Sequence, residues 1–109
     1  MQFKDISKKA KEIRKAYNEV NKRNNKKIWD AFDYGQGLVG DVGDLAKLLI
    51  SFRDKPRKDT YKKIQHEVGD CLWSLVAIAQ ELGISLEKEF LVNVEYLEQK
   101  MKEKRKKNS

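Results

Sequence analysis

Residues 38–45 read LVGDVGDL and residues 64–71 read IQHEVGDC, so one pattern of carboxylates, glycine and apolar residues occurs twice in the chain. At 100° per residue, Asp41 falls within the apolar stripe of its segment and Glu67 at the edge of the corresponding stripe. A carboxylate on a buried stripe costs several kcal/mol unless it is paired or coordinates a metal. The repeated pattern therefore predicts two facing helices that share a cation site.

Apolar residues also recur at helical spacing along the rest of the chain. Pro56 separates two of the periodic segments, Gly83 is a suitable helix stop, and Ser85 a suitable helix cap. No alternating run bounded by turn residues predicts a strand. We expect an all-α fold, a four-helix bundle, with helices over residues 5–24, 36–52, 59–82 and 86–105.

The length of 109 residues suits a single domain, residues 1–109, with a basic tail that frays from about residue 102 to 109. No run approaches the ~18 uninterrupted apolar residues of a membrane span. The N-terminus lacks the apolar segment of a secretory signal, and a single cysteine excludes a disulfide framework. We expect a cytoplasmic protein with no membrane partner, small enough to need a partner subunit to bury its core.

The net charge of +7 is unevenly distributed. Residues 1–28 and 100–109 together carry +12, whereas residues 29–99 carry −5. An acidic middle is expected where carboxylates gather around a divalent cation, and it would repel the phosphates of a nucleic acid. Because the two ends are strongly basic, a helical module that binds nucleic acid through them stays an alternative to an enzyme.

Two acidic pairs on facing helices, joined by a short linker at residues 53–58, offer hard oxygen ligands. Such a set suits Mg²⁺, with Mn²⁺ as a substitute, and substrate phosphates as further ligands. One ion or two would fit this chemistry. A glycine in the middle of each helix costs about 1 kcal/mol relative to alanine, which close approach of the helices or room for a ligand would offset. The candidate ligands are Asp41, Asp44, Glu67 and Asp70.

The same residues resemble the MazG-like, all-α nucleoside triphosphate pyrophosphohydrolases, which include the dimeric dUTPases and dCTP pyrophosphatases. Residues 37–46 resemble the family's first acidic block, with Asp in place of both Glu residues. Residues 67–73 resemble the second block closely, and AQELGISL at residues 79–86 resembles the turn into the last helix. The resemblance covers about residues 28–97.

This resemblance implies helical subunits that assemble as homodimers or homotetramers. It implies Mg²⁺-dependent cleavage of a nucleoside or deoxynucleoside triphosphate to the monophosphate and pyrophosphate, as in sanitation of nucleotide pools. By position, the metal-binding and catalytic residues are then Asp41, Asp44, Glu67 and Asp70, with Asp41 assigned to orient the attacking water.

Two features depart from the family pattern. Asp at positions 41 and 44 shortens the reach of each carboxylate by roughly 1.5 Å. The last helix lacks the family's phosphate-binding Lys, so a protein that binds metal or nucleotide without turnover is a further alternative. Trp73 is interpreted as either a base contact or a subunit-interface residue. The candidate substrate-binding residues are Trp29, Asp33, Lys47, Trp73 and Asn93.

Overall fold

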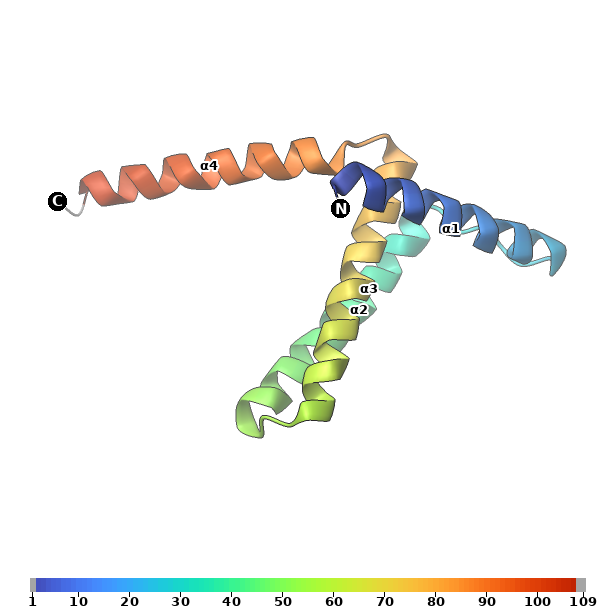
Figure 1. The fold of residues 1–109 in the computed structure, drawn as a ribbon, viewed down its shortest axis with the longest axis horizontal. Coiled ribbons are helices and arrows are strands. Elements are labelled where there is room, and N and C mark those ends of the chain that lie inside the picture. Colours follow the sequence, from blue (N-terminus) through green and yellow to red (C-terminus); the bar gives the residue numbers. More distant parts are fainter. Residues whose placement is uncertain (1, 108–109) are drawn as a thin grey trace.

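The computed structural model describes residues 2–107 and contains four helices (Figure 1). No strand occurs in this part of the chain. The prediction of an all-α fold with four helices is therefore confirmed. The helices are α1 (Phe3–Arg23), α2 (Ala31–Asp54), α3 (Lys58–Leu82) and α4 (Leu86–Lys107).

The start of α2 lies five residues before the predicted one because a reciprocal cap forms there. The Asp30 carboxylate accepts a hydrogen bond from the backbone N–H of Asp33, and the Asp33 carboxylate accepts one from the backbone N–H of Asp30, both at 3.0 Å. Such a box satisfies backbone donors that the first helical turn leaves unpaired. The end of α3 is as predicted, since Gly83 adopts a left-handed conformation with φ of 68°.

The main packing unit is an antiparallel hairpin of α2 and α3 (Figure 1). Helix α1 crosses the end of this hairpin, where small residues of α3, Ala77 and Ala79, are buried. Arg14 of α1 is buried there, and its guanidinium lies over the Tyr34 ring at 5.3 Å from the centroid. The same guanidinium forms an ion pair with Glu81 at 3.0 Å, which fixes α1 against α3.

Helix α4 lies apart from the hairpin, so one chain by itself does not form the predicted four-helix bundle. The turn of Gly83, Ile84 and Ser85 directs α4 away from α3, and α1 and α4 extend to opposite sides of the hairpin end (Figure 1). The radius of gyration is 17.9 Å, against about 13 Å for a compact domain of this length. The described chain is therefore extended, with α4 contributing little to its packing.

The tail expected to fray continues α4 as regular helix to Lys107, and residues 108 and 109 lie outside the described part. Lys, Arg and Glu are good helix formers, and Glu98 and Lys102 form an ion pair at 3.5 Å across one helical turn. Every side chain from residue 102 to 107 is exposed. The tail therefore owes its helical structure to local propensity and not to tertiary packing.

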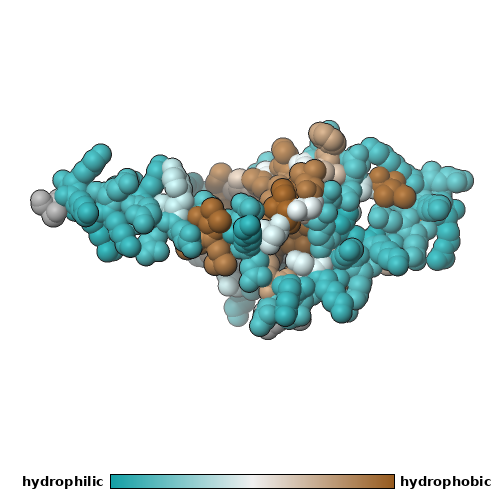
Figure 2. Space-filling model, turned by 90° about the horizontal axis from the view of Figure 1, so that it is seen from above, coloured by the Kyte–Doolittle hydropathy of each residue, from teal (hydrophilic) through white to brown (hydrophobic). Residues whose placement is uncertain are grey.

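The isolated chain leaves an unusually large surface exposed. Its accessible area is 9216 Å², against about 6,300 Å² for a monomer of its mass. No large side chain among residues 2–107 is fully buried. Figure 2 shows hydrophobic residues gathered in the middle of the upper face and mostly hydrophilic residues over its two ends. None of the helices in this part is both long and apolar enough to cross a membrane.

Candidate functional site

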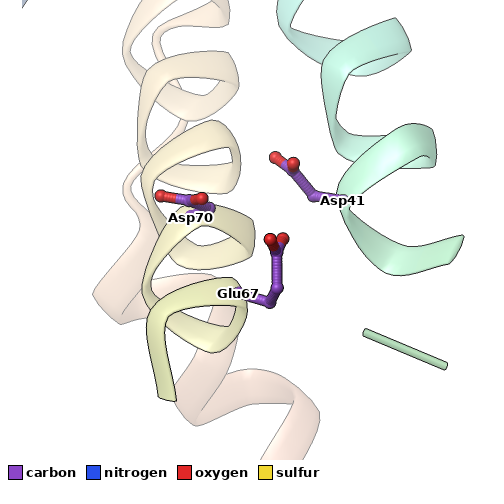
Figure 3. A group of neighbouring side chains, drawn as sticks. All are labelled: Asp41, Glu67 and Asp70. Atoms are coloured by element: carbon purple, nitrogen blue, oxygen red, sulfur yellow. The ribbon is translucent and has the colours of Figure 1, made fainter. Parts of the chain in front are cut away.

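Three carboxylates meet in the groove between α2 and α3. Asp41 of α2 and Glu67 and Asp70 of α3 each place one oxygen within 4.8 Å of the other two, and all three residues are half-buried (Figure 3). We call these residues the acidic triad. An octahedral Mg²⁺ ion with oxygens at about 2.1 Å holds adjacent ligand atoms about 3 Å apart.

The local sequence explains why these carboxylates converge. Residues three apart on a helix lie on the same face, so Glu67 and Asp70 project from one side of α3. Asp41 lies on the side of α2 that faces α3, and its side chain points across the groove toward Glu67 (Figure 3). The antiparallel hairpin thus brings together residues that are far apart in sequence.

Glu67 has the least favourable environment of the three. Its Oε2 atom is buried and has no hydrogen-bond partner among residues 2–107. Burial raises the pKa of Glu67 above its ordinary value, and the negative charges of Asp41 and Asp70 raise it further. A buried oxygen without a donor, next to two like charges, is a position that a bound cation would satisfy. The donor set and this unpaired oxygen therefore fit a divalent metal ion.

A basic groove of about 490 Å³ adjoins the triad toward the hairpin turn. Helix α2 contributes Lys47, and α3 contributes Lys62, Lys63 and His66. The ammonium groups of these three lysines form no ion pair with any residue between 2 and 107. Glu67 lines the same groove, so unpaired positive charge lies directly beside the acidic triad.

An aromatic groove of about 580 Å³ adjoins the triad on the other side, and Asp70 forms part of its wall. The Trp29 and Tyr34 rings meet edge to face, with centroids 5.4 Å apart, and Trp73 contributes a third ring. A Cβ atom at Gly37 would lie 3.5 Å from the Trp29 ring, so the small residue lets that ring lie close to α2. Helix α1 forms the remaining wall.

The basic groove, the acidic triad and the aromatic groove follow one another along one side of α3. Lys63, Glu67, Asp70 and Trp73 follow one another at helical spacing, over about 15 Å of helix axis. Glu67 lines the basic groove and Asp70 lines the aromatic groove. The acidic triad therefore lies between a surface suited to anions and a surface suited to planar rings.

Of the other site residues predicted from the sequence, some line the two grooves and some do not. Trp29, Lys47 and Trp73 line the two grooves as described. Asp44 lies outside the acidic triad: it is exposed and lines the basic groove beside Lys47. The charge of Asp44 still acts on the triad, since it contributes to the raised pKa of Glu67.

Asp33 and Asn93 are not brought to the triad. Asp33 serves the start of α2: it caps the helix and forms an ion pair with Lys27 at 3.2 Å. The hydrogen bond from the Asp30 backbone, together with Lys27, lowers the pKa of Asp33. Asn93 is exposed on α4, away from both grooves in this chain.

Sequence reasoning missed two groups of residues. Lys63 stands four residues before Glu67, a spacing that itself indicates the same face, and Lys62 lines the same groove beside it. His66 also lines the basic groove, and it pairs with Asp70 at 3.1 Å across one helical turn. No sequence signal marks the contribution of α1 to the aromatic groove, because that depends on how α1 crosses the hairpin.

The comparisons with known proteins give no independent indication of family. No family model, no curated protein and no solved structure matches this chain.

Proposed function

We propose that this protein is an Mg²⁺-dependent, MazG-like pyrophosphohydrolase that converts a nucleoside or deoxynucleoside triphosphate to the monophosphate and pyrophosphate. The observation that supports the proposal most is the position of the acidic triad between a basic and an aromatic groove. A triphosphate nucleotide carries the same three chemical parts in the same order: a planar base, a metal-binding phosphate chain, and further anionic charge. The resemblance of residues 37–46 and 67–86 to the MazG-like enzymes supports the same conclusion.

Asp41, Glu67 and Asp70 would hold the metal ion, and Mn²⁺ would substitute for Mg²⁺ because both accept carboxylate oxygens. When bound, the ion would neutralise phosphate charge, a large part of catalysis in phosphoryl transfer. Asp44 would contribute negative charge at the edge of the site, as a partner of a second ion or of Lys47.

The protein's own groups supply the rest of the mechanism. Lys47, Lys62 and Lys63 would bind the phosphates that leave as pyrophosphate. Trp29 and Trp73 would hold the base by stacking. Asp41 would orient the water whose oxygen bonds to phosphorus as the anhydride bond between the α and β phosphates breaks. The electron pair of that bond leaves with pyrophosphate, and the water proton passes to the carboxylate or to solvent.

The proposal includes self-association as a homodimer or homotetramer. The accessible area of the chain exceeds that of a compact monomer of the same mass by an amount typical of an obligate interface. The apolar side chains of α4, among them Phe90, Leu97 and Met101, are about half exposed and have no helix packed on them. A second copy would cover these faces and complete a helical bundle.

The test is release of pyrophosphate from a panel of nucleoside and deoxynucleoside triphosphates, with Mg²⁺ and with EDTA. We expect metal-dependent release from one or a few of them, and its loss in Asp70→Asn. Asp54→Asn is the matched control, because Asp54 is exposed at the far end of α2 and, among residues 2–107, forms an ion pair only with Arg53. Circular dichroism checks that both variants remain helical.

Two other functions predict different experimental outcomes. Nucleotide affinity without pyrophosphate release would indicate a binding protein of this fold. The concentration of basic residues in α1 and in the last turn of α4 favours a nucleic-acid-binding module as the second candidate. Retardation of DNA or RNA at low salt, weakening steeply as salt rises, would support that function.

A further inference from the structure

The aromatic groove contains two polar side chains that the proposed function does not use. Asn18 and Asn21 of α1 line its wall opposite α3. Residues three apart on a helix lie on one face, so both amides face the same groove. Both residues are half-buried, in contrast to the exposed residues at most other polar positions of α1.

Neither amide has an internal partner. No residue between 2 and 107 donates a hydrogen bond to the side chain of Asn18 or Asn21, or accepts one from it. Each amide offers two N–H donors and a carbonyl acceptor. The groove therefore presents free amide donors and acceptors together with aromatic rings.

The position of α1 is fixed, so these amides are held in place. The Arg14 guanidinium forms hydrogen bonds or ion pairs with the side chains of Tyr34, Gln80 and Glu81. The Gln80 amide in turn donates to the backbone carbonyl of Ser7 at 2.6 Å. Asn18 stands one helical turn after Arg14, so the contacts that hold Arg14 also position the wall of the groove.

The ligand that matches this groove is planar, aromatic, and bears hydrogen-bonding groups on its edge. A nucleobase has these properties: every base has a π-face for stacking, and the bases differ in the donors and acceptors on their edges. Asp70 belongs both to this groove and to the acidic triad, so a base held here is adjacent to the metal-binding carboxylates.

We propose that Asn18 and Asn21 determine base specificity, by hydrogen bonding to the edge of a nucleobase held against the rings of Trp29, Tyr34 and Trp73. This inference rests on the proposed function for the identity of the bound molecule as a nucleotide. A site built to hydrogen-bond a ligand discriminates strongly, because an analogue with the wrong edge leaves buried polar groups unpaired.

The experiment compares affinities for ATP, GTP, CTP and UTP, measured by quenching of tryptophan fluorescence with Ca²⁺ in place of Mg²⁺. Substitution of Asn by Asp removes the donors and leaves acceptors, with little change of shape. In Asn18→Asp and Asn21→Asp, we expect the ratio of the affinity for CTP to that for UTP to rise about tenfold in at least one variant, because a carboxylate accepts from the N4 amino group of cytosine and repels the O4 oxygen of uracil. Asn18→Ala and Asn21→Ala should bring the four affinities closer together.

Asn24→Asp is the matched control, since Asn24 follows the last turn of α1 and lies outside the groove. Its affinity ratios should equal those of the parent chain. Equal affinity of the parent chain for all four triphosphates, or unchanged ratios in both Asp variants, would overturn the inference. Circular dichroism of each variant shows whether the helices are retained.

The two proposals fail in different ways. Base-dependent binding that shifts in the Asp variants, without pyrophosphate release under Mg²⁺, would leave the inference standing and refute the hydrolase. Pyrophosphate release with base ratios that do not respond to Asn18 or Asn21 would leave the hydrolase standing and refute the inference.

Discussion

The α2–α3 hairpin and α4 have opposite relations to the rest of the chain. All are long, regular helices with apolar stripes, but α2 and α3 lie against each other whereas α4 extends alone (Figure 1). The hairpin uses contacts within the chain to bring three carboxylates within 4.8 Å of one another. Helix α4 carries its apolar residues into solvent. The difference indicates that one chain suffices to position the triad but not to bury its own hydrophobic surface.

The largest expected effect is the loss of activity caused by a substitution in the hairpin. We predict that Glu67→Gln lowers Mg²⁺-dependent pyrophosphate release by at least about 100-fold, because removal of one charge-stabilising group costs that much in comparable sites. Asp44→Asn, an exposed neighbour outside the triad, should lower it by less than about tenfold. Steady-state kinetics of the two variants checks the difference. Equal losses would mean that the triad does not define the site.

The next effect concerns α4. We predict that Leu97→Glu, which places a charge in the exposed apolar stripe, lowers the molar mass measured by light scattering to that of one chain. Gln99→Glu introduces the same residue at a polar, exposed position nearby and should leave the mass unchanged. A parent chain that is monomeric at micromolar concentration would refute the proposed self-association through α4.

A smaller effect is expected in the basic groove. We predict that Lys63→Ala raises KM about tenfold and weakens inhibition by inorganic pyrophosphate, while kcat changes little, because the lysine binds phosphate in ground and transition states alike. Lys55→Ala, outside this groove at the end of α2, provides the control. An unchanged pyrophosphate inhibition constant in Lys63→Ala would remove this groove from the site.

The smallest effect is a dependence of stability on pH that involves Glu67. Its pKa is raised in the folded chain, first by burial and then by Asp41 and Asp70. The folded state therefore binds the proton more tightly, and the stability from this group is fully present below its unfolded pKa and is lost as the pH rises through the raised value.

Thermal unfolding in EDTA, from about pH 4 to about pH 8, measures this dependence. The midpoint of the parent chain should fall relative to that of Glu67→Gln as the pH rises. Added Mg²⁺ should raise the unfolding midpoint of the parent chain again at the higher pH, because a metal ion binds the deprotonated form of its ligands. A difference between the two proteins that does not change with pH would contradict the assigned environment of Glu67.

Most of the secondary structure could be predicted from the sequence because periodicity and helix signals are local. Pro56 and Gly83 correctly separate the helices around them. The predicted start of α2 was five residues late, although the spacing of Asp30 and Asp33 is the signature of a reciprocal cap. The position of α4 could not be predicted in this way, because periodicity does not determine which helix its apolar stripe packs against.

The site was predictable to the extent that it lies on one hairpin. The duplicated pattern predicted Asp41, Asp44, Glu67 and Asp70, and the structure brings three of these four together, because a short linker makes the two helices antiparallel. The contribution of Asn18 and Asn21 depends on the crossing of α1, which is fixed by the contacts of Arg14 with residues up to 67 positions away. Such long-range contacts leave no periodic trace in the sequence.

The central claim is that the acidic triad binds a divalent metal ion, and titration calorimetry with Mg²⁺ and Mn²⁺ tests it most directly. We predict saturable binding of both ions to the parent chain and to Asp54→Asn, and its loss in Asp41→Asn, because Asp41 is the only triad ligand on α2. Absence of binding to the parent chain, or unchanged binding in Asp41→Asn, would contradict the account.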